Sequence, residues 1–261
     1  MATPRHVPRK RFGQHFLVDR SVIARIIHAI DPKPGEHIVE IGPGLGALTV
    51  PLLEHVGHLH VVELDRELCD RLRERYPAER LAVHQADALR FDFAKLPAPL
   101  RIVGNLPYNI STPLLFHVAN SADRCSDLHF MLQQEVVDRM VASPSHTDYG
   151  RLSVMLQYRF RMERLFTVAP SAFRPAPKVH SACVRLVPRR SQERKALDEL
   201  EFAKVVVKAF SMRRKTLRNA LRDLIPESEL AALGIDPGAR AQNLPVEDFV
   251  KIANRLADLT N

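Results

Sequence analysis

Short apolar runs alternate with helical patterns along the first half of the chain, and this alternation restricts the fold more than any other feature. The apolar runs have the length of buried strands and cover residues 37–41, 59–64, 81–85, 100–103 and 128–132. Helical patterns separate most of them, which is the arrangement of right-handed βαβ units. We therefore expect an α/β fold with a doubly wound, mostly parallel sheet.

The last third of the chain has a different pattern. A late strand is predicted over residues 179–187, and the segment after it opens with proline and is polar and charged, as linkers are. Only helical patterns follow that segment. We therefore predict a large α/β domain over residues 1–187, a linker over 188–198 and a small all-helical C-terminal domain over 199–261.

Charge and residue types narrow the partners and the compartment. The chain has 38 Lys and Arg against 30 Asp and Glu, and this net charge of +8 favours nucleic acid or an anionic membrane as partner, or serves only solubility. The three cysteines lack C-x-x-C spacing and the 12 histidines lack H-x-x-x-H spacing, so we expect no disulfide framework and no metal. Because no run of some 18 apolar residues is present, we expect a soluble, cytoplasmic protein without membrane contact.

A glycine-rich segment between the first strand and the next helix predicts a ligand site. Gly42 and Gly44 leave backbone open to a ligand, and Glu63 follows about 20 residues later, where a carboxylate can accept hydrogen bonds from both ribose hydroxyls. Asp87 follows the third strand at the same edge and can accept from an adenine amino group. These residues indicate a nucleoside pocket, although a dinucleotide fingerprint or a turn needed only for tight geometry also fits.

The end of the fourth strand carries a catalytic motif. The adenine N6 lone pair is delocalised into the ring, so alkylation requires hydrogen-bond acceptors for its N–H groups. Asn105 and the carbonyl of Leu106 can be those acceptors, Pro107 stiffens their geometry, and Tyr108 offers a face for stacking an extruded base. If the methyl donor is a sulfonium compound, its methyl group is already activated. Catalysis then requires mainly the alignment of nitrogen, methyl and sulfur. The alternative is an ordinary turn after a strand.

Several segments resemble the 16S ribosomal RNA adenine dimethyltransferases of the KsgA type, a resemblance that covers nearly the whole chain. The similar segments are residues 9–17, 40–44, 105–111, 170–173, 213–219 and 234–237. The resemblance implies a Rossmann-like, S-adenosylmethionine-dependent methyltransferase with S-adenosylhomocysteine as product. It also implies N6,N6-dimethylation of two adjacent adenosines in a hairpin near the 3′ end of 16S rRNA, within the immature 30S subunit, and a role in small-subunit biogenesis. We expect a monomer.

The resemblance also implies which residues bind. It places these residues in the S-adenosylmethionine pocket: His15, Leu17, Gly42, Gly44, Glu63, Asp87, Ala88 and Asn105. Tyr108 and Phe173 are expected to flank the target base, and the alternative for Phe173 is a core residue. Family members often carry asparagine where this chain has His15, so Leu17 is the firmer expectation.

Two basic groups are candidates for RNA contact. Arg9, Lys10 and Arg11 form the first group, and the second is Arg214, Arg218 and Arg222. The second group is spaced i, i+4, i+8, which predicts one stripe along a helix. Such a stripe is often only a solvated face, but two groups that flank a base-modifying core favour phosphate contacts.

Other functions remain open at this point. One is an assembly factor that recognises the small subunit and whose catalysis is incidental. Another is a nicotinamide-dependent oxidoreductase, for which no hydride-transfer constellation is evident. The third alternative function is the same methylation of adenine in large-subunit RNA or in DNA. It stays open because the core motifs specify N6 alkylation and not the nucleic acid.

Overall fold

The computed structural model describes residues 14–212 and 214–260, which fall into two compact units. The first, the sheet unit, comprises the described residues up to Val137 together with Glu163–Pro188. The second, the helical unit, comprises Asp138–Met162 and the described residues from Arg189 onward. The break after Pro188 lies beside the predicted linker, whereas Asp138–Met162 joins the helices although the sequence patterns assign it to the first domain.

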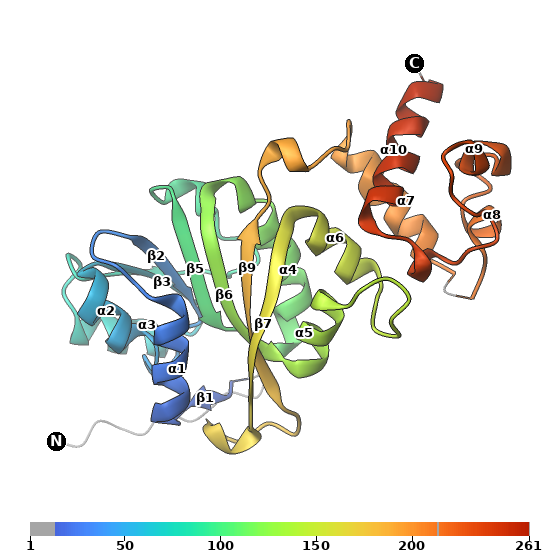
Figure 1. The fold of residues 1–261 in the computed structure, drawn as a ribbon. Helices are drawn as coiled ribbons and strands as arrows, with labels where there is room; N and C mark the ends of the chain where they lie inside the picture. Colours follow the sequence, from blue (N-terminus) through green and yellow to red (C-terminus); the bar gives the residue numbers. More distant parts are fainter. Residues whose placement is uncertain (1–13, 213, 261) are drawn as a thin grey trace. The chain divides into compact units, whose positions relative to one another are not determined.

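A seven-stranded sheet in the order β4-β3-β2-β5-β6-β9-β7 is the frame of the sheet unit (Figure 1). Strands β2 to β6 pair in parallel, and β6 pairs antiparallel with β9. This confirms the predicted mostly parallel α/β sheet. The strands are β2 (His37–Ile41), β3 (Leu59–Glu63), β4 (Leu81–Gln85), β5 (Leu100–Asn105), β6 (Cys125–Gln133), β7 (Phe160–Val168) and β9 (Ser181–Pro188).

The sequence patterns do not predict β7. This strand is last in the sheet order, and Arg161, Glu163 and Arg164 are exposed along it. A strand at the edge of a sheet can carry charged side chains on its open side. It therefore lacks the continuous apolar run that marks the central strands.

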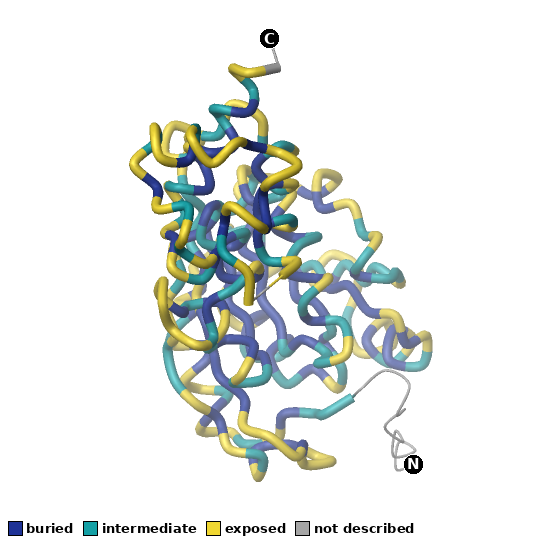
Figure 2. The backbone as a smooth tube through the Cα atoms, turned by 90° about the vertical axis from the view of Figure 1, so that its right-hand side faces the viewer, coloured by how far each residue is buried: buried dark blue, intermediate teal, exposed yellow. Residues whose placement is uncertain are grey.

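Helices cover the sheet and bury its apolar residues. Ile26 of one helix and Leu52 of the next pack in one hydrophobic cluster with Ile38 and Val61 of the sheet. The central strands β2, β3, β5 and β6 are largely buried, and Figure 2 shows buried and exposed residues along the backbone. The helices that belong to the sheet unit or begin in it are α1 (Arg20–Ile30), α2 (Thr49–Val56), α3 (Arg66–Arg75), α4 (Ser111–Ala119) and α5 (Gln134–Val141).

A buried arginine ties α1 to the sheet. Arg101 on β5 donates to Asp127 on β6 at 2.8 and 3.0 Å and to Glu36 at 2.6 Å. It also donates to the carbonyl of Ile30 at the end of α1, at 2.5 Å. Burying this charge is tolerable because carboxylates and carbonyls surround it.

The helical unit has its own core. Tyr158 of α6 lies 4.3 Å from Phe202 of α7 between ring centroids, and Phe202 shares a hydrophobic cluster with Leu217 and Phe249. The helices are α6 (Arg151–Arg159), α7 (Glu199–Phe210), α8 (Leu217–Ala220), α9 (Glu227–Ala232) and α10 (Val246–Thr260). Across the described residues of both units, no helix combines the length and apolarity that crossing a bilayer requires.

The expectation that Arg214, Arg218 and Arg222 lie along one continuous helix is wrong. Helix α8 contains only four residues, so Arg218 is helical while Arg214 and Arg222 lie in turns on either side of it. All three side chains are exposed. The spacing i, i+4, i+8 places residues on one helical face only if the helix continues through all of them.

Candidate active site

A cavity of about 330 Å³ opens at the carboxyl ends of β2, β3 and β5 in the sheet unit. Ligand pockets begin at about this volume. The cavity brings together most of the site residues expected from the sequence: His15, Leu17, Gly42, Gly44, Glu63, Asp87, Ala88, Asn105, Leu106, Pro107 and Tyr108. Parallel strands end at one edge of the sheet, which is why segments far apart in the chain meet there.

The glycine loop after β2 forms the floor of the cavity. Gly42 has a φ of +68° and Gly44 a φ of +55°. Residues other than glycine rarely adopt this backbone conformation. A Cβ atom at Gly44 would also lie 3.1 Å from the ring of Phe16. Both positions therefore favour glycine for conformation, and a side chain at Gly44 would also require the Phe16 ring to move aside.

Glu63, the last residue of β3, presents a constrained carboxylate to the cavity. Its Oε1 accepts hydrogen bonds from the backbone N–H groups of Leu64 at 2.8 Å and Asp65 at 2.9 Å. Its Oε2 accepts from Gly44 N–H at 3.3 Å, a longer bond. Burial raises the pKa of Glu63, and the three backbone donors oppose that shift. The weakly bonded Oε2 can accept from a ligand hydroxyl.

Glu40 on β2 also lines the cavity, and sequence reasoning missed it. It is buried and accepts a hydrogen bond from Thr49 Oγ1 at 2.6 Å. Burial raises its pKa to about 8, the Thr49 bond opposes the shift, and the nearby charge of Glu63 adds to it. A carboxyl inside an otherwise apolar strand was the available signal, because such a group is costly to bury without a role or a partner.

Asp87 and Asn105 complete the polar side of the cavity. Leu89 N–H donates to Asp87 Oδ1 at 2.9 Å, which fixes that carboxylate in the turn after β4. Asn105 Nδ2 donates to the backbone carbonyl of His15 at 3.0 Å. Because the amide nitrogen is engaged there, the amide oxygen is the atom left to accept a hydrogen bond in the cavity.

Tyr108 begins a short 3₁₀ helix, η3 (Tyr108–Ile110). Its Oη lies 2.6 Å from Ser181 Oγ, and its ring stacks on His15 with 5.5 Å between centroids and 26° between planes. Burial raises the pKa of Tyr108, and the hydrogen bond with Ser181 opposes that shift. The phenol therefore stays protonated at neutral pH, and Tyr108 lines the cavity.

Phe173 lies elsewhere than expected. It forms β8 (Phe173–Arg174), which pairs antiparallel with β1 (Phe16–Leu17), and its side chain is fully buried in the hydrophobic cluster that also holds Leu17. It does not line the cavity. The expectation that Phe173 flanks a base gives way to the core alternative, since a side chain with 0% exposure offers no face to a base.

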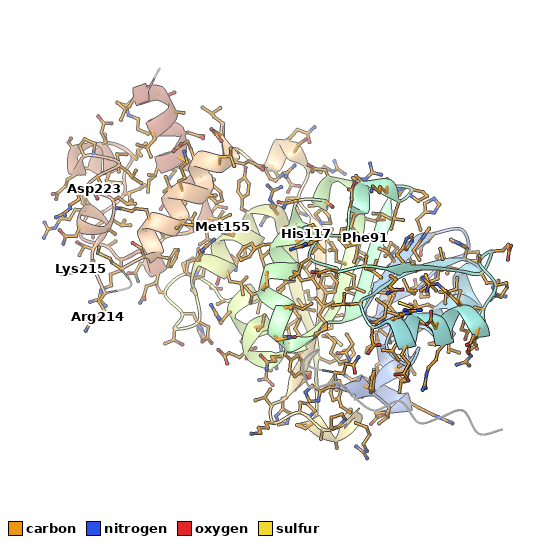
Figure 3. The ribbon with its side chains drawn as sticks, turned by 180° about the vertical axis from the view of Figure 1, so that it is seen from behind. Phe91, His117, Met155, Arg214, Lys215 and Asp223 are labelled. Atoms are coloured by element: carbon orange, nitrogen blue, oxygen red, sulfur yellow. The ribbon has the colours of Figure 1, made fainter. Side chains whose placement is uncertain are left out.

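The expected RNA-contact residues fall into two classes. Arg9, Lys10 and Arg11 lie outside the described residues. In the helical unit, Arg218 lies 3.7 Å from Glu227, and Arg222 lies 3.4 Å from Asp223. Figure 3 labels Arg214, Lys215 and Asp223, which lie in the turns before and after α8. Exposed pairs of this kind exchange partners at little cost, so the arginines can turn to phosphate.

Metal chemistry has no visible site in the part of the chain that the structure describes. Over those residues, no group of three or more His, Cys, Asp or Glu side chains is arranged to hold a metal ion. The cavity itself presents hydrogen-bond acceptors from Glu63, Asp87 and Asn105.

Known proteins are similar to this chain in both sequence and fold. A family model described as Ribosomal RNA adenine dimethylase matches residues 5–258. A protein of Aromatoleum aromaticum named Ribosomal RNA small subunit methyltransferase A is 64% identical over 97% of this chain and 95% of its own. Another of that name, from Chromobacterium violaceum, is 60% identical over 97% of both chains.

Two solved structures extend the comparison. A dimethyladenosine transferase from Plasmodium falciparum has a TM-score of 0.80 at 26% identity, over 91% of this chain and 96% of its own. The 23S rRNA methyltransferase ErmE has a TM-score of 0.70 at 28% identity, over 93% of this chain and 99% of its own. Since the family model and the relatives match nearly the full length, the chain belongs to the ribosomal RNA adenine dimethylase family.

Proposed function

We propose that this protein transfers methyl groups from S-adenosylmethionine to the N6 atoms of two adjacent adenosines in a hairpin near the 3′ end of 16S rRNA. The product is N6,N6-dimethyladenosine. The observation that carries the proposal is the orientation of Asn105, whose Nδ2 is held by the His15 carbonyl so that Oδ1 is available as an acceptor. The names of the relatives at 64% and 60% identity support the small subunit, since ErmE, named for 23S rRNA, is only 28% identical.

The residues of the cavity fit S-adenosylmethionine. Glu63 and Asp87 line the cavity, so Glu63 Oε2 can accept from ribose hydroxyls and Asp87 can accept from the adenine amino group. Gly42 and Gly44 line the same cavity, and their backbone would be open to the remaining part of the cofactor. When bound, the cofactor supplies an activated methyl group on a sulfonium sulfur.

The protein's own residues supply alignment and acceptors. Asn105 Oδ1 and the Leu106 carbonyl accept hydrogen bonds from the N–H groups of the target amine. This favours a pyramidal nitrogen with its lone pair directed at the methyl group. The backbone that enters Leu106 is held to β6, because the Leu106 N–H donates to Met131 O at 3.1 Å. No strong base is required, since the alkylated nitrogen becomes acidic and releases its proton to water.

The RNA surface is also part of the proposal. We assign phosphate contacts to Arg214, Arg218 and Arg222, which are exposed, and to the group of Arg9, Lys10 and Arg11. The substrate is 16S rRNA within the immature 30S subunit, and the enzyme acts as a monomer in the cytoplasm, with a role in small-subunit biogenesis.

The variant Asn105→Ala tests the proposal. Loss of one preorganised hydrogen-bond partner of the transition state lowers rates by about 10²–10³, so we expect that loss in single-turnover methyl transfer at saturating S-adenosylmethionine. The control is Asn120→Ala, an exposed asparagine at the end of α4. Transfer by Asn105→Ala at the wild-type rate would refute the assigned mechanism, and calorimetric binding of NAD in place of S-adenosylmethionine would refute the cofactor.

A further inference from the structure

We propose that Ser181 and His15 are positioning residues that hold Tyr108 from two directions, so that the target adenine meets a fixed stacking surface. This inference rests on the proposed function. Tyr108 belongs to a 3₁₀ helix of only three residues, and its hydroxyl and one ring face are both engaged by residues distant in the chain. A short helix alone would leave the ring free to change rotamer.

Ser181 fixes the hydroxyl end of the ring. It is fully buried and is the first residue of β9, where it pairs with Gln133 of β6. Its Oγ lies 2.6 Å from Tyr108 Oη. Ser181 therefore lies on β9, a strand that is held by its pairing with β6. A hydroxyl on such a rigid element can hold the phenol of Tyr108 within a narrow range of positions.

His15 fixes one ring face. Its imidazole stacks on Tyr108, and its Nδ1 lies 2.8 Å from the carbonyl of Pro175, which stops the imidazole from rotating away. The backbone carbonyl of the same residue holds the Asn105 amide. One residue thus joins the acceptor of the target amine to the surface on which the base stacks.

The arrangement decides where the base can lie. With His15 on one face of Tyr108, an adenine stacks on the remaining face, giving the order imidazole, phenol, base. Alignment of the nitrogen with the sulfonium methyl is sensitive to shifts of about 1 Å, which cost up to 10²-fold in rate. An asparagine at position 15 would have no ring to stack, so backing of the tyrosine by an imidazole is a property of this chain's histidine.

A double-mutant cycle tests the hydroxyl anchor. Ser181→Ala and Tyr108→Phe each remove one partner of a neutral hydrogen bond, so each should lower the single-turnover rate on small-subunit particles by about 3- to 10-fold. The double variant should be no slower than the slower single variant, because both changes remove the same interaction. The affinity for S-adenosylmethionine should change by less than about threefold. Ser153→Ala, a fully buried serine of the helical unit, is the matched control.

Ring substitutions test the second contact. His15→Ala should be about 3- to 10-fold slower than the wild type at saturating cofactor, and His15→Phe, which keeps a ring against Tyr108, should recover part of that loss. Both keep the backbone carbonyl that holds Asn105. If Ser181→Ala unfolds, Tyr108→Phe still tests the anchor.

The outcomes separate the two proposals. Wild-type transfer to adenine N6 tests the proposed function, and the rates of the variants relative to wild type test the clamp on Tyr108. Additive losses in the double variant, wild-type rates in Tyr108→Phe and His15→Ala, or losses that appear only as weaker cofactor binding would each overturn the clamp while leaving the function in place.

Discussion

Replacing Glu63 by glutamine should weaken the binding of S-adenosylmethionine while leaving the fold intact. In the wild type, Oε1 accepts two short backbone bonds, from Leu64 at 2.8 Å and Asp65 at 2.9 Å. The single oxygen of glutamine takes that place, since it is the only acceptor available for both donors. The amide NH₂ then faces the Gly44 N–H, which approaches Oε2 at 3.3 Å in the wild type, and it presents donors to the ribose hydroxyls.

The expected magnitude follows from the bonds lost. A hydrogen bond to a charged acceptor contributes about 1.5–3 kcal/mol, and about 1.4 kcal/mol corresponds to a tenfold change in Kd. We therefore expect Kd to rise by about 10- to 100-fold. Isothermal titration calorimetry measures it directly, with Glu74→Gln, an exposed glutamate on α3, as the control.

The pH dependence gives an independent check. Burial raises the pKa of Glu63, with the backbone donors opposing the shift, so the carboxylate gains its proton at a higher pH than an ordinary glutamate. Cofactor affinity should therefore fall as the pH is lowered, and the Glu63→Gln variant should lose this dependence. A variant that binds within twofold of wild type, with the same thermal stability, would refute the role given to Glu63.

Three further predictions concern stability. Burial raises the pKa of Glu40 from 4.5 to about 8 in the folded protein. The unfolded chain therefore releases that proton first, and folding stability declines as pH rises from about 4.5 to 8. Glu40→Gln should show a smaller decline in Tm over this range, and an unchanged slope would contradict the assignment. Arg101→Met leaves Asp127 buried without its main partner, so urea unfolding should show a loss of about 3–5 kcal/mol; wild-type stability would refute it. At Gly104 a Cβ would lie 2.5 Å from Ile41 O. Gly104→Ala should therefore lower the free energy of unfolding by about 1–3 kcal/mol, and a neutral result would contradict the close approach of β5 to β2.

The fold and the polar residues of the site other than Glu40 could be predicted because they depend on local patterns. Apolar runs mark central strands such as β2 and β5, and the residues that end parallel strands necessarily share an edge, which brings Glu63 and Asn105 to one cavity. An edge strand such as β7 carries charged residues and leaves no such pattern.

Contacts across long stretches of sequence could not be predicted. The bond between Tyr108 and Ser181 joins residues 73 positions apart, and that between His15 and Pro175 spans 160 positions. The burial of Phe173 is decided by the pairing of β1 with β8, and an aromatic side chain looks the same in sequence whether it covers a ligand or fills a core.

The most direct test of the central claim is to identify the methylated nucleoside. The purified protein would be incubated with labelled S-adenosylmethionine and small-subunit particles that lack the modification, with large-subunit RNA and DNA as controls. The RNA would then be digested and analysed by mass spectrometry. We predict N6,N6-dimethyladenosine in small-subunit RNA alone. Label confined to a control nucleic acid, or no transfer by a protein that still binds S-adenosylmethionine, would contradict the proposed function.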